Sequence, residues 1–131
     1  MILLDTHVLV WMVSAPAKIS REAARQIRKA QREDGCAIAS FTLWELALLY
    51  RRNRLRGAGT VEASISEILE KSRVTVIDLT PEIAALAMSF PDNYPRDPGD
   101  RLIGATARAL AMTLITQDER ILASPLIRSV W

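Results

Sequence analysis

The sequence predicts an α/β fold with a central parallel sheet of about five strands flanked by helices. Two observations lead to this prediction. Apolar runs of strand length alternate along the 131 residues with longer segments of helical period, which is typical of parallel sheets. Half of the residues are hydrophobic but only 5% are aromatic, so the core is expected to consist of Leu, Ile, Val and Ala. Because this length suits one compact core, we expect a single domain over residues 1–131.

The first part of the chain is expected to hold a buried strand and a helix. The apolar start, residues 1–13, lacks the basic leading region of a signal sequence and is interpreted as a buried strand, with Met1–Leu4 in the sheet. Ser20 has the side chain of an N-cap for a helix through Arg32. The apolar side of this helix consists of Ile19, Ala23, Ala24, Ile27 and Ala30.

The same alternation continues to the end of the chain. Thr42 is expected to open a helix that two glycines break, and Thr60 to cap the next one. A cap residue followed by proline, which has no N–H to lose, marks two further helix starts at Thr80 and Asp97. The expected strands are 36–39, 74–77, 113–116 and 127–131, and the two proline-marked helices are 81–89 and 98–111.

Four acidic residues lie where an apolar strand stops or a helix begins. They are Asp5, Glu45, Asp100 and Asp118. If the strands before them are neighbours in a parallel sheet, all four reach the edge where α/β proteins bind ligands. Four carboxylates that close together cannot all stay ionised without a cation or raised pKa values. Oxygen ligands of this kind suit Mg²⁺ or Mn²⁺, and such sites hydrolyse phosphodiesters.

Most of these acids also have a purely structural explanation. Glu45 follows Thr42 at the capping-box spacing, so its carboxylate could reach back to the Thr42 N–H. Asp97 suits an N-cap, and Asp100 suits the positive end of the helix dipole. Asp5 is harder to explain in this way, because it lies in an apolar segment without a basic residue and a buried charge needs a partner.

Charge and cysteine content exclude some kinds of binding site but do not determine the function of the protein. The net charge of +2 permits a polyanionic partner without requiring one, and the cluster from Arg51 to Arg56 could contact phosphates or simply cover a solvated helix end. Cys36 is the single cysteine, which excludes an internal disulfide and a cysteine zinc cluster. Charges interrupt every hydrophobic run before the roughly 20 residues that span a bilayer, so we expect no membrane association and a cytoplasmic location.

Four sequence blocks resemble the acidic blocks of PIN-domain ribonucleases. They are Leu3-Leu4-Asp5-Thr6-His7, Ser40-Phe41-Thr42-Leu43-Trp44-Glu45, the block from Arg96 to Ala107, and Leu114-Ile115-Thr116-Gln117-Asp118. Their order and spacing cover nearly the whole chain, and the Asp-Pro-Gly-Asp-Arg block is most similar to VapC toxins of bacterial toxin–antitoxin pairs. Each block alone is weak, but the ordered set is specific.

This resemblance implies that Asp5, Glu45, Asp100 and Asp118 hold Mg²⁺, with Mn²⁺ as a substitute, and activate water to cut single-stranded or looped RNA. Cleavage would leave a 3′-hydroxyl and a 5′-phosphate. A homodimer and a small antitoxin protein that covers the acidic groove are also implied. Residues that could support the acids are Thr6, Asp97 and Thr116, with Asp97 favoured as a helix cap.

The roles of several residues, and the choice between protein classes, have more than one interpretation. A structural role is favoured for His7, and core packing for Trp11, Trp131 and the stripe around Trp44, although the stripe could also contact a partner. The small residues Gly99 and Gly104 are expected to loosen the helix that carries Asp100. A PIN-like module that binds RNA or protein without cutting is the main alternative. A phosphoryl-transfer enzyme fits less well because His7 stands where a second Asp is common, and a receiver domain fits less well because no lysine follows the late strand.

Overall fold

A five-stranded, fully parallel sheet forms the centre of the molecule, as the sequence predicts. The structure is a computed structural model that describes residues 1–57 and 59–131. The strand order is β3-β2-β1-β4-β5, and every pairing is parallel. The strands are β1 (Ile2–Leu4), β2 (Cys36–Ala39), β3 (Thr75–Ile77), β4 (Thr113–Ile115) and β5 (Ser129–Val130).

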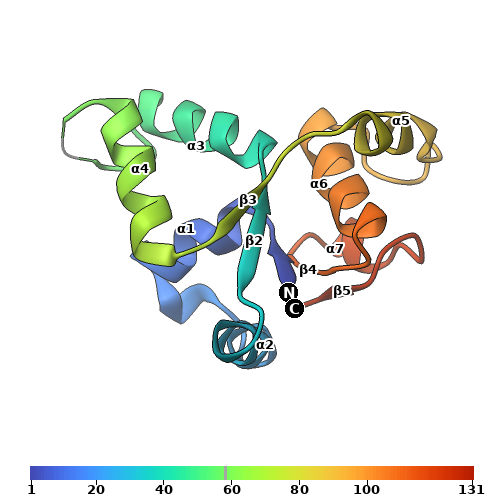
Figure 1. Cartoon of the computed structure of the whole chain (residues 1–131), viewed down its shortest axis with the longest axis horizontal. Coiled ribbons are helices and arrows are strands. Elements are labelled where there is room, and N and C mark those ends of the chain that lie inside the picture. Colours follow the sequence, from blue (N-terminus) through green and yellow to red (C-terminus); the bar gives the residue numbers. More distant parts are fainter. Residues whose placement is uncertain (58) are drawn as a thin grey trace.

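Helices cover both faces of this sheet (Figure 1). One group consists of α1 (Thr6–Ser14), α2 (Arg21–Arg32), α3 (Phe41–Arg51) and α4 (Val61–Ser72), with a 3₁₀ turn, η1, at Pro16–Lys18. The other group consists of α5 (Pro81–Ser89), α6 (Pro98–Ala109) and α7 (Glu119–Leu122). Within the described residues, no helix is long and apolar enough to cross a membrane.

The alternation of side chains along the strands divides the interior into two cores. Ile2 and Leu4 of β1 pack with Leu46 of α3 and Ile68 of α4, whereas Leu3 between them packs on the opposite face with Ile103 of α6. Successive side chains of a strand point to opposite faces, so a sheet covered on both sides needs apolar residues at every position. This explains why the central strands read as continuous apolar runs.

One predicted element is wrong. Residues 6–14 form the helix α1 instead of continuing a buried strand. Asp5 is extended (φ −65°, ψ 154°) and its carboxylate accepts a hydrogen bond from the Thr6 N–H, so the helix begins directly after β1. Six consecutive apolar residues from Val8 to Val13 show neither a strand period nor a helix period, which is why the pattern misled the prediction.

Four of the predicted helix starts are confirmed by their caps, whereas α3 begins at Phe41 rather than at the predicted Thr42 and has no side-chain cap. Ser20, Thr60, Thr80 and Asp97 each accept a hydrogen bond from the backbone N–H three residues ahead. Differences elsewhere are small: α6 ends at Ala109, two residues before the predicted end, and the last strand is limited to Ser129–Val130. Helix ends of this kind commonly shift by one or two residues.

Candidate active site

The predicted acids converge at the point where the order of the strands reverses. The chain runs from β1 outward to β2 and β3 and then returns to β4 on the other side of β1. Asp5 follows β1 and Asp118 comes three residues after β4, at the carboxyl ends of these neighbouring strands. Such a switch point is the usual ligand position in α/β sheets.

A pocket of about 430 Å³ opens at this place. We call it the acid pocket; its lining residues are Asp5, His7, Val8, Trp11, Glu45, Asp100, Gln117, Asp118 and Glu119. All four predicted acids therefore line one pocket, together with a fifth acid, Glu119, that was not predicted from the sequence. The helices α1, α6 and α7 begin beside it, and their positive dipole ends favour negative charge there, while α3 contributes Glu45 from its second turn.

Thr116 connects two of the acids. This residue is fully buried, and its Oγ1 donates a hydrogen bond to Asp5 Oδ2 at 2.7 Å while accepting one from the Asp118 N–H at 3.1 Å. Asp118 in turn caps α7 by accepting the N–H groups of Arg120 and Ile121. One hydroxyl thus fixes Asp5 relative to the turn that carries Asp118.

Thr6 holds the third acid. Its hydroxyl donates to Glu45 Oε1 at 2.6 Å and also lies 3.0 Å from the hydroxyl of buried Thr42. The capping box expected between Thr42 and Glu45 is not formed, because α3 begins at Phe41 and its N-cap is Ser40. Glu45 is therefore held by a residue 39 positions earlier in the chain rather than by its own helix.

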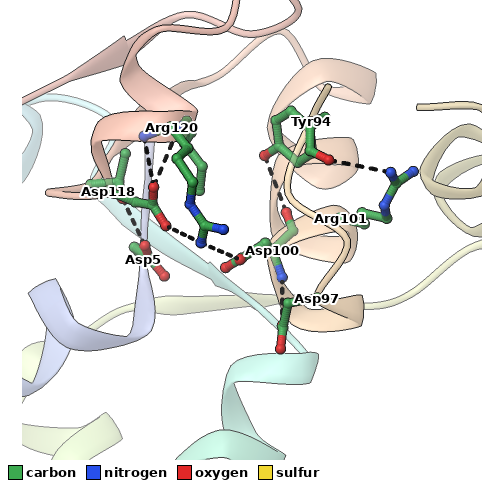
Figure 2. Close-up of polar contacts among 9 residues, drawn as sticks. Asp5, Tyr94, Asp97, Asp100, Arg101, Asp118 and Arg120 are labelled. Carbon is green, nitrogen blue, oxygen red and sulfur yellow. Dashed lines mark hydrogen bonds and ion pairs between the residues drawn. The ribbon is translucent and has the colours of Figure 1, made fainter. Parts of the chain in front are cut away.

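The helix α6 presents the fourth acid. Asp97 accepts a hydrogen bond from the Asp100 N–H at 3.2 Å, which confirms its predicted role as N-cap. Tyr94, only 1% exposed, donates its hydroxyl to the backbone carbonyl of Asp100 at 3.2 Å. Figure 2 shows Tyr94 and Asp97 contacting Asp100 from opposite sides, so two separate hydrogen bonds hold the start of this helix in place.

Gly99 and Gly104 allow this helix to pack closely, contrary to the expectation that they loosen it. A Cβ at Gly99 would lie 2.8 Å from the Phe41 ring and 3.2 Å from Glu45 Oε2. A Cβ at Gly104 would overlap the Tyr94 hydroxyl and lie 3.2 Å from the Phe90 ring. The missing side chains bring α6 against its neighbours and thereby help to position Asp100.

The sequence did not indicate roles for two arginines near the pocket. Arg101 donates to the backbone carbonyls of Phe90, Pro91 and Tyr94 and so fastens the loop before α6. Arg120 points from α7 toward the acids: its Nη2 is 3.3 Å from Asp118 Oδ2 and 3.9 Å from Asp100 Oδ2 (Figure 2). The roles of these arginines depend on contacts with other segments: the carbonyl partners of Arg101 lie in the loop before α6, and Arg120 approaches Asp100 of α6 in addition to the neighbouring Asp118.

Burial and mutual repulsion shift the pKa values of these acids. Burial, with the charges of Asp97 and Asp5, raises the pKa of Asp100 to about 7. Burial likewise raises the pKa of Glu45, against the opposing hydrogen bond from Thr6. Partial burial of Asp118 acts in the same direction, but hydrogen bonds from Arg120 outweigh it and the pKa of Asp118 is lowered. The raised pKa values of Asp100 and Glu45 indicate that the protein groups around the pocket do not stabilise all of these carboxylates in their ionised form.

The chemistry of the donor set fits a hard divalent cation. Among residues 1–57 and 59–131, no three acidic, histidine or cysteine side chains are grouped as a complete ion-binding cluster. Carboxylate oxygens from four elements nevertheless face one pocket, and two of these acids have raised pKa values. Oxygen ligands without sulfur are the set that Mg²⁺ and Mn²⁺ prefer.

The remaining candidate residues fall into two groups. Trp11 and Trp131 pack against the core, with ring centroids 5.8 Å apart, as expected. Trp44 is 59% exposed, so core packing is wrong for this residue. The alternation that favoured a structural role for His7 is also absent, since the segment is helical; His7 is exposed and lines the acid pocket.

A second cavity of about 560 Å³ lies beside the acid pocket and shares His7 and Glu45 with it. We call it the tryptophan groove; its lining residues are Thr6, His7, Phe41, Trp44, Glu45, Leu48, Leu49, Arg52, Arg54, Asp97, Pro98 and Gly99. Phe41 and Trp44 have ring centroids 5.5 Å apart. Two arginines of the predicted basic cluster therefore face this groove, next to exposed aromatic surface.

Comparison with known proteins agrees with this architecture. The PIN domain family model matches residues 2–124. Ribonuclease VapC22 from Mycobacterium tuberculosis is 36% identical over 120 residues, which cover 92% of this chain and 88% of that protein.

Solved structures show the same fold at lower identity. A chain of VapBC2 from Rickettsia felis, bound to a promoter DNA fragment, has a TM-score of 0.75 at 19% identity and covers 100% of this chain and 99% of its own. A chain of DNA-bound VapBC from Salmonella typhimurium has a TM-score of 0.70 at 21% identity, with 99% and 98% covered. The family match and the VapC22 relative together show that this chain belongs to the PIN-domain family and, within it, to the VapC-type proteins.

Proposed function

We propose that this protein is a metal-dependent endoribonuclease and the toxin of a type II toxin–antitoxin pair. The observation that carries the proposal is the convergence of Asp5, Glu45, Asp100 and Asp118 on one pocket at the switch point of the sheet. The name of the VapC22 relative supports ribonuclease activity, and the toxin–antitoxin complexes among similar structures support the biological role.

The four acids would bind Mg²⁺, or Mn²⁺ in its place. A bound ion supplies an activated water and neutralises the charge on the reacting phosphate. Thr116 holds Asp5, and Thr6 holds Glu45, so two ligands are oriented before any ion arrives. The water oxygen would form the new bond to phosphorus while the bond to the 3′ oxygen breaks, leaving a 3′-hydroxyl and a 5′-phosphate without a covalent intermediate.

Single-stranded or looped RNA is the proposed substrate. The tryptophan groove provides an exposed ring, Trp44, and two cations, Arg52 and Arg54, directly beside the acids. Aromatic rings stack on unpaired bases and arginines contact phosphates, so this surface suits a single strand. A small antitoxin would block the same region, and the exposed apolar face around Trp44 suits such a partner. A homodimer in the cytoplasm completes the proposal.

A cleavage assay tests this function. Purified protein would be incubated with a labelled pool of structured RNA in Mg²⁺, in Mn²⁺ and in EDTA, beside the folded variants Asp5→Asn and Asp100→Asn. We expect metal-dependent cutting that both variants lose, with 5′-phosphate product ends. Arg28→Ala, an exposed residue of α2, is the matched surface control. RNA binding without cutting by the wild type would favour the inactive binding module instead, and equal cutting by all variants would reject the assigned site.

A further inference from the structure

Among the described residues, Arg120 is the arginine whose guanidinium forms ion pairs with acids of the pocket. It is the second residue of α7, and its Nη2 approaches Asp118 Oδ2 at 3.3 Å and Asp100 Oδ2 at 3.9 Å. These two acids belong to different helices, and Figure 2 shows the guanidinium between them. The side chain is 69% exposed, whereas those of Asp118 and Asp100 are 25% and 23% exposed. The arginine therefore covers the acids from the solvent side.

The ion pairs of Arg120 with Asp118 and Asp100 are weak enough for another cation to replace the guanidinium. Exposed ion pairs contribute little to stability, since water and salt screen them. Within the described part of the chain, the guanidinium forms one hydrogen bond, from Nη2 to Asp118, so most of its five N–H groups lack a protein partner. A divalent ion that binds the same carboxylates would replace the guanidinium.

The displaced guanidinium keeps its charge, because arginine does not lose its proton in proteins. Its backbone is fixed, since the Arg120 N–H donates to Asp118 Oδ1 at 2.9 Å. The side chain would therefore stay at the rim of the acid pocket, where the substrate phosphate must arrive. A planar guanidinium with free N–H groups suits two phosphate oxygens at once.

Resting on the proposed ribonuclease function, we propose that Arg120 is a substrate-contacting residue with two alternative partners. In the ion-free protein it pairs with Asp118 and Asp100. When a divalent cation takes these carboxylates, Arg120 turns to the RNA phosphate beside the scissile bond. The same side chain thus competes with the metal and assists substrate binding.

Two binding measurements on Arg120→Ala, Arg120→Lys and the control Arg28→Ala test this proposal. Free Mn²⁺ would first be titrated by electron paramagnetic resonance in the absence of RNA. We expect Arg120→Ala to bind Mn²⁺ about two- to fivefold more tightly than wild type, because the competing cation is gone. Arg28→Ala, which removes the same charge from α2, should bind Mn²⁺ as the wild type does.

Binding of a single-stranded RNA oligonucleotide would then be measured in Ca²⁺ at several salt concentrations, with gels confirming that it stays uncut. Arg120→Ala should bind about three- to tenfold more weakly, and the slope of log affinity against log salt should fall by about 0.7, the value for one phosphate of a single strand. Arg120→Lys should bind RNA more weakly than wild type with an unchanged slope, since it keeps the charge but loses the planar fork.

The outcomes separate this inference from the function on which it rests. Unchanged Mn²⁺ affinity and unchanged RNA binding in Arg120→Ala would overturn the proposal while wild-type cleavage stands. Tighter Mn²⁺ binding with an unaltered salt slope would overturn the phosphate contact and leave Arg120 as a counter-ion alone. A wild type that neither binds Mn²⁺ nor cuts RNA would instead reject the proposed function, and the inference with it.

Discussion

Thr116 and Asp5 lie 111 residues apart in the chain, yet the hydroxyl of Thr116 donates a 2.7 Å hydrogen bond to Asp5 Oδ2. The pairing of β1 with β4 produces this contact, since Leu4 is aligned with Ile115 and the Asp5 N–H donates to the Ile115 carbonyl at 3.0 Å directly after the strands. The same hydroxyl accepts the Asp118 N–H. Strand register therefore determines the separation of two acids of the site.

Thr116→Val tests whether this hydroxyl matters for metal binding. The substitution keeps the shape but removes the hydrogen bond to Asp5 and leaves the Asp118 N–H without its partner. We expect Mn²⁺ affinity to fall about 10- to 100-fold, the usual effect of losing a group that orients a ligand, and stability to fall by about 1–3 kcal/mol.

Isothermal titration and thermal unfolding would measure these two effects. Thr116→Ser, which keeps the hydroxyl, should stay near wild type, and Thr75→Val on the exposed side of β3 should change neither property. Full Mn²⁺ affinity in Thr116→Val would show that the acids are oriented without this bond.

Asp100 makes the ion-free protein less stable as the pH rises. Its pKa is about 7 in the folded protein, against an ordinary value of 3.8, so the folded state keeps a proton that the unfolded state has lost between these pH values. The stability contributed by this proton is complete below pH 3.8 and is lost as the pH approaches 7. The loss amounts to at most about 4 kcal/mol.

Asp100→Asn removes this titration. In EDTA, the melting temperature of the variant relative to wild type should increase from pH 4 to pH 7, by about 4 °C for each kcal/mol. Added Mn²⁺ should stabilise the wild type and leave the variant nearly unchanged. A difference between variant and wild type that stays constant over this pH range would contradict the raised pKa.

Gly104 and Tyr94 should show a strong energetic coupling. Gly104→Ala places a methyl group against the Tyr94 hydroxyl, which must shift away from the Asp100 carbonyl. We expect a loss of about 1–3 kcal/mol in the free energy of unfolding. Tyr94→Phe removes the overlapping oxygen, so the double variant should be more stable than the sum of the single effects. Denaturant unfolding of the four proteins gives the coupling, and simple additivity would rule out this contact.

Arg101 should act on stability rather than on RNA. Its guanidinium donates to the carbonyls of Phe90, Pro91 and Tyr94, an arrangement that one ammonium group cannot reproduce. Arg101→Lys should therefore lower the free energy of unfolding by about 1–3 kcal/mol. The salt dependence of RNA binding should stay that of the wild type. A smaller slope of log affinity against log salt in Arg101→Lys would instead indicate that Arg101 contacts an RNA phosphate.

Local chemistry made much of the fold predictable. The side chains of Ser20, Thr60 and Thr80 cap helices at the predicted positions, because a cap depends on residues within one turn. The helix α1 was missed because its apolar residues, buried from Val8 to Val10, have no period that separates a strand from a helix.

In the site, too, features set by the local sequence were predictable, whereas contacts between distant segments were not. Asp5 and Asp118 follow strands, so a sheet pattern was enough to place them at one edge. The bond between Thr6 and Glu45 and the approach of Arg120 to Asp100 depend on how separate helices pack. The capping-box spacing predicted a contact between Glu45 and Thr42. This prediction was wrong because the spacing takes account of residues within one helix only, whereas the partner of Glu45 lies on another helix.

Locating a bound ion is the sharpest test of the proposed metal site. Crystals of the protein soaked in Mn²⁺ would be measured at a wavelength where manganese scatters anomalously, beside crystals of Asp5→Asn. We predict an anomalous peak inside the acid pocket, about 2 Å from carboxylate oxygens of the four acids, and its loss in the variant. A pocket without a peak at saturating Mn²⁺, or a peak that Asp5→Asn leaves in place, would contradict it.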